Sequence, residues 1–405
     1  MSELNSEPPG IRLGTAAFTR IRIALFLGGF STFLMVYCVQ PLLPLFARDY
    51  GISPAQSSIA LSTTTGTMAF MLVAATVLSD KVGRRKLMVF SLLAGALLML
   101  SCAAASHFHA LVILRTLQAV ALAGLPAVAM AYLAEEIEPS ALGYAMGFYI
   151  GGNALGGMSG RTLSAWVAEH SSWQTALAAI GTLALLMAMG FWRLLPPSRH
   201  FRPRPLRLAL LWEGVRTHLR DAQLPWLFLL GFLLLGSFVS TYNYLSFRLA
   251  LPPFSLSTSQ IGHVFLLYII GMLSSTWAGR LADRFGLSRV LWVAAAWMLL
   301  GILLTLSETL WVLLVGVAVL TSGFFGSHAV ASSWVGRRAK TAKGLASALY
   351  LWAYYFGSSL LGTFSGTLWS VGGWGAIVAC LSACLVVCLA VAIHLRRGER
   401  GQASC

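Results

Sequence analysis

Thr76-Val-Leu-Ser-Asp-Lys-Val-Gly-Arg-Arg-Lys86 is a short charged segment that separates two long apolar runs. A diverged copy, Gly279-Arg-Leu-Ala-Asp-Arg-Phe-Gly-Leu-Ser-Arg289, lies in the second half of the chain. Asp283 follows Asp80 by 203 residues (283 minus 80), close to half of the 405 residues. The spacing therefore predicts a duplicated unit that carries the same charged loop at the same place in each half.

The composition is that of a protein embedded in lipid. Hydrophobic residues make up 58% of the chain, charged residues only 10%, and the mean hydropathy is +0.77. A soluble domain typically carries about 25% charged residues, so the composition excludes the soluble classes. The net charge of +15 would also suit a nucleic-acid partner, but membrane proteins collect Lys and Arg in their cytoplasmic loops. The positions of the charges decide between the two.

Twelve apolar segments have about the length that crosses a bilayer, roughly 20 residues. They are expected to be helical, because lipid offers no hydrogen-bond partner to backbone N–H and C=O groups. Met1 to Arg22 is polar, and we expect a short tail there rather than a cleavable signal peptide. The predicted spans are residues 23–47, 55–79, 86–105, 108–134, 141–167, 173–195, 225–249, 259–282, 288–306, 309–334, 344–369 and 374–395.

The positive charges are distributed very unequally between the two sides of these spans. With the N-terminus inside, nearly all Lys and Arg at the span ends fall on the cytoplasmic side, and only Arg48 and Arg248 fall outside. This bias predicts that both termini are cytoplasmic. It also accounts for the basic balance of the chain, so no nucleic-acid partner is expected.

The longest polar connection, Pro196 to Leu224, divides the spans into two groups of six. Six is even, so both groups enter from the same side, as parallel repeats do. Leu206 to Leu219 has the pattern of a basic amphipathic helix on the anionic inner leaflet, with a solvated linker as the alternative. We therefore predict an all-α membrane protein with twelve transmembrane helices in two pseudo-symmetric six-helix bundles. The predicted parts are a cytoplasmic tail (1–22), a first bundle (23–195), a basic cytoplasmic linker (196–224), a second bundle (225–396) and a cytoplasmic tail (397–405).

Three motifs resemble those of the major facilitator superfamily. The charged segment is similar to its signature loop between helices 2 and 3, Gly-x-x-x-Asp-(Lys/Arg)-x-Gly-(Arg/Lys)-(Arg/Lys), with Thr76 in place of the first glycine, which Gly279 keeps in the second copy. Leu111 to Ala119 resembles the helix-4 motif Arg-x-x-Gln-Gly, with alanine as its last residue. Gly147 to Gly157 resembles the helix-5 glycine motif of antiporters, with Asn153 where a proline is usual.

The resemblance covers nearly the whole chain and implies a secondary transporter, most similar to bacterial inner-membrane drug and sugar efflux proteins. It implies a small-molecule substrate exported by alternating access, a monomer without cofactor or metal, and protons as the candidate coupling ion. Import or facilitated passage of a small organic anion or neutral solute stays open, as does a channel or sensor. The sequence contains no His-Glu-x-x-His, nucleophile-elbow or P-loop motif, so we expect no enzymatic activity.

The two charged loops are predicted to act as latches on the cytoplasmic side. An aspartate can accept from free N–H groups at the start of a neighbouring helix, where the helix dipole favours an anion. The resemblance implies that Asp80 caps helix 11 near Ala342, and symmetry places Asp283 on helix 5 near Ser140. Loops with scattered charge are the alternative. The candidate latch residues are Asp80, Gly83, Arg84, Asp283, Arg284 and Gly286.

Two arginines lie within predicted spans, whereas no acidic residue lies in the middle of one. An intramembrane arginine usually faces a cavity, which is the interpretation for Arg115, with snorkelling to the interface as the alternative. For Arg161, snorkelling or structural pairing is favoured, with a functional role as the alternative. Arginines at depth without a carboxylate favour neutral or anionic substrates over cationic drugs. Coupled protons would then use Asp49, a histidine such as His328, or the substrate itself.

The resemblance also implies that helices 1, 4, 7 and 10 line the substrate cavity. Residues at helical spacing give an aromatic pocket with a few polar groups, which suits an amphipathic small molecule; helix packing or lipid contact is the alternative for the aromatic residues. The predicted cavity residues are Tyr37, Gln40, Arg115, Gln118, Asn243, Tyr244, Phe324, His328 and Tyr354. Because small residues let helices approach and slide, we expect gating glycines, although static packing would use them too. They are Gly147, Gly151, Gly152, Gly156 and Gly157.

Overall fold

The computed structural model describes residues 10–198, 201 and 208–403. Within these ranges the backbone is helical almost throughout, and one isolated bridge pairs Ile11 with Ile137. The helices of the first half are α1 (Ala16–Tyr37), η1 (Gln40–Leu42), α2 (Leu43–Tyr50), α3 (Pro54–Val82), α4 (Arg84–Ala103), α5 (Phe108–Leu122), α6 (Gly124–Glu136), α7 (Pro139–His170) and α8 (Trp173–Leu194). Those of the second half are α9 (Leu208–Leu219), α10 (Leu224–Ala250), α11 (Thr258–Val264), η2 (Phe265–Leu267), α12 (Tyr268–Phe285), α13 (Leu287–Leu304), α14 (Leu310–Arg338) and α15 (Lys343–Ala403).

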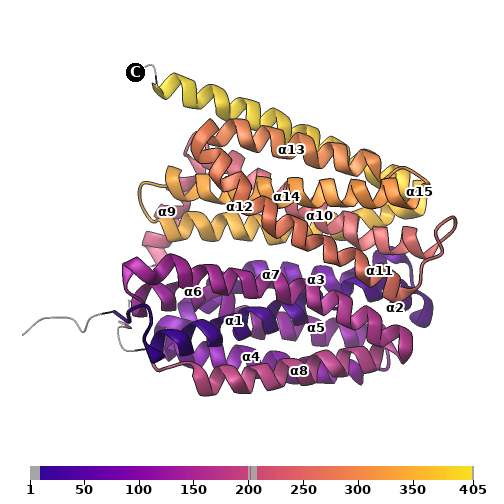
Figure 1. Cartoon of the computed structure of the whole chain (residues 1–405), viewed down its shortest axis with the longest axis horizontal. Coiled ribbons are helices and arrows are strands. Elements are labelled where there is room, and N and C mark those ends of the chain that lie inside the picture. Colours follow the sequence, from indigo (N-terminus) through magenta and orange to yellow (C-terminus); the bar gives the residue numbers. More distant parts are fainter. Residues whose placement is uncertain (1–9, 199–200, 202–207, 404–405) are drawn as a thin grey trace, which may run out of the picture.

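The helices form two bundles, one above the other in Figure 1, with α1 to α8 below and α10 to α15 above. α9 lies beside the upper bundle, at the end where the chain crosses from one bundle to the other. The predicted all-α architecture of two helical bundles is confirmed. We call the end of the bundles near α9, at which α4 begins with Arg84 and α14 ends with Arg338, the basic end. We call the end at which α2 and α11 lie the opposite end.

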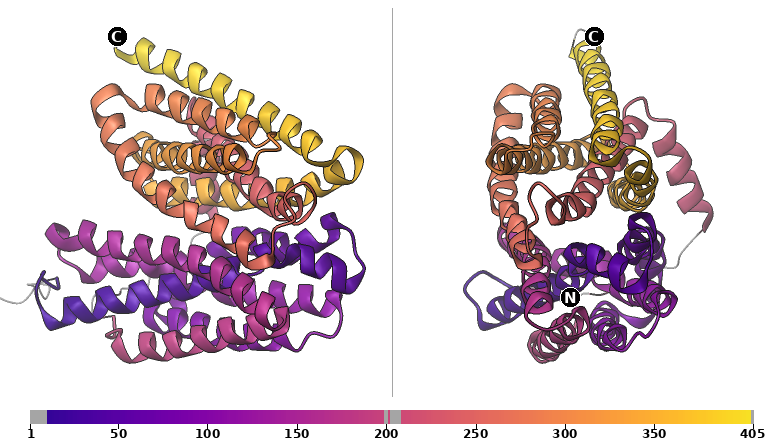
Figure 2. Two further views of the ribbon diagram at one scale, coloured as in Figure 1. Left: turned by 45° about the vertical axis from the view of Figure 1, so that its right-hand side comes forward. Right: turned by 90° about the vertical axis from the view of Figure 1, so that its right-hand side faces the viewer.

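The number of membrane-crossing helical passes agrees with the number predicted from the sequence. Among the described residues, 10 helical stretches are long and apolar enough to cross a membrane. One of them, Lys343–Arg397, supplies two passes, because Gly372 and Gly373 leave the helical conformation and the chain folds back there (Figure 2). α7 completes the set with 32 residues, and its many glycines, Asn153 and Arg161 lower its hydropathy. The described part of the chain therefore makes twelve passes.

The backbone repeats itself where the sequence does. Gly83 ends α3 with φ 91° and ψ 147°, and Gly286 ends α12 with φ 92° and ψ 147°. A residue with a Cβ is strained at these positive φ values, so both copies of the charged loop need a glycine at this turn. At the opposite end, Ser53 and Ser257 each begin a capping box with a glutamine three residues on. The internal duplication therefore extends to both ends of these helices.

Close helix pairs hold each bundle together. A Cβ at Gly152 of α7 would lie 2.6 Å from the carbonyl oxygen of Phe26 in α1. Gly357 of α15 meets the backbone of Phe232 in α10 in the same way. Small residues permit these approaches, and the two pairs occupy corresponding places in the two bundles. The larger buried side chains fill the space between the remaining helices.

The connection between the bundles is anchored to the second one. α9 occupies most of the range predicted for an amphipathic helix, of which residues 206 and 207 lie outside the described part. Asp221 accepts hydrogen bonds from the backbone N–H of Gln223 (2.8 Å) and Leu224 (3.0 Å) and pairs with Arg338 (3.0 Å). Burial alone would raise the pKa of Asp221, but these bonds outweigh it and hold the pKa below its usual value. The start of α10 is thus tied to the end of α14.

Candidate functional site

The two bundles are joined more closely at the opposite end than at the basic end. In the left view of Figure 2 the ribbons of the two bundles converge toward the opposite end and diverge toward the basic end. At the opposite end α7 contacts α11 and η2, and Thr162 Oγ1 donates to the Gly262 carbonyl oxygen at 3.2 Å. In the half of α7 nearer the basic end, a Cβ at Gly143, Gly147 or Gly151 would meet nothing within 4 Å. The described structure is therefore closed at the opposite end.

A chain of buried polar side chains crosses between the bundles near this closure. Arg161 of α7 is 2% exposed, and its Nε donates to Gln40 Oε1 at 2.6 Å. Gln40 Nε2 donates in turn to Asn243 Oδ1 of α10 at 2.7 Å. Gln40 projects from η1, where Pro41 interrupts the helix begun by α1. The interruption places Gln40 between an arginine of the first bundle and an asparagine of the second.

Aromatic rings enclose the Arg161 guanidinium. Its Cζ lies 4.1 Å from the ring centroid of Tyr37, 4.7 Å from that of Tyr268 and 5.3 Å from that of Phe265. The ring faces attract the cation electrostatically, and two of the three rings come from the second bundle. We call Arg161, Gln40, Tyr37, Phe265 and Tyr268 the arginine box. Snorkelling of Arg161 to the membrane interface is wrong, because the side chain is buried against these groups.

No carboxylate neutralises this arginine. Within the described residues, Arg161 takes part in no ion pair. Among the acidic residues that the structure describes, only Glu136 is buried, and it ends α6 at the basic end. An isolated buried charge is costly, so the arginine box is electrostatically incomplete.

Arg115, the other intramembrane arginine, is fully buried in a different setting. It donates to the carbonyl oxygens of Met35 (2.8 Å), Val36 (2.6 Å) and Ala60 (3.3 Å) and to Gln118 Oε1 (2.6 Å). The first two carbonyls are at the end of α1, where helical N–H partners run out and the helix dipole favours a cation. Burial excludes snorkelling for Arg115 as well. It holds the end of α1 and, through it, the segment that carries Gln40; its contact with substrate stays a prediction.

Three other predicted cavity residues, Phe324, His328 and Tyr354, form a second cluster in the upper bundle. His328 Nδ1 lies 2.9 Å from Tyr350 Oη, and the His328 and Tyr354 rings are 4.6 Å apart. Phe324 stacks on Phe238 at 3.9 Å. The remaining predictions fall elsewhere: Gln118 supports Arg115, and Tyr244 donates to the Gly362 carbonyl oxygen at 2.9 Å and stacks on Trp369.

The predicted gating glycines divide into two groups. Gly152 and Gly156 pack against the backbone of α1, and Gly157 adjoins the Arg161 side chain. A Cβ at Gly147 or Gly151 would meet nothing within 4 Å. Their role in gating stays a prediction.

Each latch aspartate is paired within its own bundle. Asp80 accepts from Arg84 Nη1 at 2.9 Å, and Arg84 Nη2 also reaches Glu135 at 3.0 Å. Asp283 pairs with Arg337 at 2.7 Å. The helix starts predicted as their partners belong to a state closed at the basic end, whereas the bundles diverge there in this structure. The latch therefore stays a prediction.

The sequence did not predict the roles of two residues of the closure. For Arg161 the sequence favours snorkelling or structural pairing over a functional role, although no acidic residue lies in the middle of a predicted span. Glu169, at the end of α7, accepts from the backbone N–H of Ser259 in α11 at 2.5 Å. A carboxylate at the start of a helix is stabilised by its dipole, so Glu169 links the bundles at the opposite end. Nothing in the sequence near Glu169 marks this contact.

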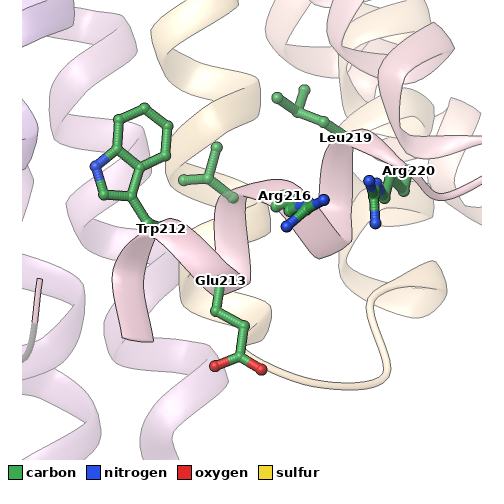
Figure 3. Close-up of a pocket in the computed structure, with 6 residues that line it drawn as sticks. Trp212, Glu213, Arg216, Leu219 and Arg220 are labelled. Carbon is green, nitrogen blue, oxygen red and sulfur yellow. The ribbon is translucent and has the colours of Figure 1, made fainter. Parts of the chain in front are cut away.

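A groove on the surface lies far from this closure. It is lined by Trp212, Glu213, Val215, Arg216, Leu219 and Arg220. Figure 3 shows Trp212, Glu213, Arg216 and Leu219 on α9 and Arg220 directly after its end. The groove is open to its surroundings, with Trp212 74% exposed, and it lies on one bundle only, so we place the candidate site at the arginine box between the bundles.

Comparison with known proteins gives the family. The sequence profile of the Major Facilitator Superfamily matches residues 25–252 and 233–404. The chain is 46% identical over 372 residues to the "Uncharacterized MFS-type transporter YybF" of Bacillus subtilis (strain 168), covering 92% of each chain. It is 45% identical over 387 residues to the "Inner membrane transport protein YnfM" of Escherichia coli (strain K12), covering 96% of this chain and 93% of that one.

Two further similarities are partial or structural. The chain is 30% identical to the "Gallate transporter" of Pseudomonas putida over 158 residues, which are 39% of this chain and 35% of that one. Among solved structures, a bacterial homologue of the human lysosomal transporter Spinster, in an inward-facing and unoccupied conformation, aligns with a TM-score of 0.78. It shares 14% sequence identity and covers 97% of this chain and 98% of its own, so it is similar in fold.

Proposed function

This chain belongs to the Major Facilitator Superfamily and is a multi-pass membrane transporter rather than an enzyme, and we propose that it exports a small, weakly acidic or neutral organic molecule by alternating access. The transporter is proposed to lie in a bacterial inner membrane, as the name of its relative, the inner membrane transport protein YnfM, indicates for that protein. The charge bias of the loops supports a cytoplasmic basic end and, with it, cytoplasmic termini. The described structure is then the inward-facing state.

One observation carries the preference for acidic or neutral substrates. The interior that the structure describes holds a buried arginine at the junction of the bundles and no buried acid near it. A permanent cation in such a site would be repelled by Arg161 and would find no counter-ion. The aromatic residues around the arginine suit an apolar or planar molecular body. The name of the gallate transporter, which refers to an aromatic carboxylate, agrees with this preference.

Alternating access is supported by two sets of contacts at opposite ends. At the opposite end Glu169 and the Arg161–Gln40–Asn243 chain hold the bundles together. At the basic end, Asp80 and Asp283 are available to cap helices of the other bundle once the bundles approach. Closing one end while the other opens would carry a bound molecule across the membrane.

Transport in proteoliposomes tests this proposal. We expect saturable export of weak organic acids that depends on an inward-directed proton gradient, with His328 as the candidate proton carrier. The measurement is flux of a panel of organic acids, sugars and cationic drugs, with and without the gradient, in vesicles of both orientations. Protein-free liposomes are the control. Flux that does not saturate would indicate a channel, electrogenic exchange of a permanent cation would contradict the substrate class, and uptake alone would reverse the direction.

Glu169→Gln is expected to weaken the closure of the opposite end. The neutral amide loses most of the attraction to the α11 dipole. At an exposed site this loss corresponds to an increase of about two- to fivefold in the population whose opposite end is open. Spin labels at Ser171 and Leu251, one on each bundle, would report this shift as a larger fraction of long distances. Glu308→Gln, at the same end but in the loop between α13 and α14, is the matched control and should leave the distances unchanged. Unchanged distances in Glu169→Gln would remove Glu169 from the closure.

A further inference from the structure

We propose that Arg161 binds the carboxylate of a small planar organic anion, which takes the place that Gln40 Oε1 holds in this structure. The inference rests on the proposed transport function and deepens it by naming the substrate class and the residue that recognises it. The ligand class is an aromatic monocarboxylate, because a carboxylate complements the guanidinium and a flat apolar body complements the surrounding rings.

The hydrogen-bond pattern of Arg161 leaves room for such a ligand. Nη1 is held by the Gly157 carbonyl oxygen at 2.7 Å and Nε by Gln40 Oε1 at 2.6 Å. No partner for Nη2 is found among the described residues. A carboxylate binds a guanidinium best through two parallel N–H···O bonds, and the Nε–Nη2 edge offers such a pair once Gln40 moves. The charged carboxylate then replaces a neutral amide oxygen, and charge-assisted hydrogen bonds are roughly twice as strong as neutral ones.

The other two buried arginines of the first bundle show what Arg161 lacks. Arg84 has two carboxylates, Asp80 and Glu135. Arg115 has the carbonyl oxygens at the end of α1. Arg161 has one amide oxygen, one carbonyl oxygen and ring faces, which offset the cost of burying a cation only in part. An anionic ligand supplies the missing counter-charge.

Unpartnered donors lie beside the arginine box. Asn243 Nδ2 and Ser240 Oγ are fully buried and make no hydrogen bond in the described structure. They are three residues apart on α10, so they share a face of the helix, and Asn243 is the residue that Gln40 contacts. Buried donors without partners are rare in proteins. Polar substituents on the ring of the ligand would satisfy them.

Aromatic side chains from both bundles would contact the body of the ligand. Tyr37 and Tyr268 face the guanidinium from the first and the second bundle. A ligand held by both bundles also loosens the Arg161–Gln40 contact that ties them together, so binding itself would favour opening of the opposite end.

Thermal unfolding of the purified full-length protein tests the inference. The probes are benzoate and gallate, and their methyl esters are the uncharged controls. We expect both acids to raise the melting temperature of the wild-type protein in a saturable manner and the esters to have little effect. In Arg161→Gln the affinity for the acids should fall by at least about tenfold, the size expected for a lost charged hydrogen bond. Arg161→Lys, which keeps the positive charge but cannot form the two parallel hydrogen bonds of a guanidinium, should bind with intermediate affinity.

Two further variants separate ligand binding from a structural effect. Arg48→Gln removes an exposed arginine at the opposite end and should leave binding unchanged. Gln40→Leu removes the group that occupies the carboxylate position, so it should bind benzoate at least as tightly as the wild-type protein. A merely structural Arg161–Gln40 contact would instead make Gln40→Leu bind more weakly.

Specific results would overturn the inference. They are wild-type affinity in Arg161→Gln, equal binding of acids and esters, or no binding of either acid by the wild-type protein. If the wild-type protein transports a neutral solute and binds no carboxylate, the transport proposal stands and the Arg161 assignment fails. If it transports nothing in the panel, the transport proposal itself fails.

Discussion

The Asp80→Asn protein is expected to fold and to insert into the membrane, but to transport at less than about a tenth of the wild-type rate. In the state closed at the basic end, Asp80 is predicted to cap the start of α15. An asparagine cannot supply the charge that the helix dipole attracts. Hydrogen bonds to charged groups contribute about 1.5–3 kcal/mol, which corresponds to a loss of roughly ten- to a hundredfold in the population of the closed state.

The contacts of Arg84 explain why the fold should survive this substitution. In the described structure Arg84 binds Asp80 at 2.9 Å and Glu135 at 3.0 Å, and it also donates to Ser79 Oγ. When Asp80 loses its charge, Arg84 keeps its ion pair with the Glu135 carboxylate, so no uncompensated buried charge results. The loss should therefore appear in transport rather than in stability.

Substrate flux and melting temperature, measured on the same preparation, check this prediction. Glu213→Gln, which neutralises an exposed acid on α9, is the matched control and should keep both values. Asp283→Asn should have a smaller effect, because Asp283 is 64% exposed and its ion pair with Arg337 is equally open to solvent. A wild-type transport rate in Asp80→Asn would remove the latch from the mechanism.

The fold was predictable because its signals are local or repeated. Lengths and hydropathy mark each span, and Gly83 and Gly286 repeat the same turn after 203 residues (286 minus 83). The candidate site was predictable only in part. The family resemblance implies which helices line the cavity, and residue character at helical spacing singles out Tyr37, Gln40 and Asn243 on them. The structure brings these three residues together around Arg161.

The different surroundings of Arg115 and Arg161 could not be read from the sequence. Both are arginines in apolar helices, but Arg115 is matched by the end of α1 about 80 residues earlier, and Arg161 by rings from α12 more than 100 residues later. Glu169 is a similar case, because its partner is a backbone N–H group of Ser259. Arg115 and Glu169 bind backbone groups, which every residue type carries, so the sequence does not mark their partners. Only the three-dimensional arrangement identifies these contacts.

Arg115→Leu is expected to destabilise the protein by roughly 3 kcal/mol or more. Each buried acceptor left without a partner costs about 1–3 kcal/mol, and the substitution strips donors from the carbonyl oxygens of Met35 and Val36 and from Gln118 Oε1. Cys38 Sγ also donates to the Met35 carbonyl oxygen at 3.3 Å, but a thiol is a weak donor, so it replaces the guanidinium only in part. We expect lower yield and a clearly reduced melting temperature in detergent.

The pattern across variants distinguishes this structural role from substrate binding by Arg115. Arg115→Lys should be intermediate in melting temperature, because one ammonium group cannot reach all four oxygens that the guanidinium fork serves. Arg48→Leu, at an exposed position, is the control and should melt like the wild-type protein. If Arg115 instead serves the substrate, Arg115→Leu will keep its stability and lose ligand binding. We instead expect Arg115→Leu to lower the melting temperature. Because Arg115 holds the segment that carries Gln40, the same substitution should also disrupt the arginine box.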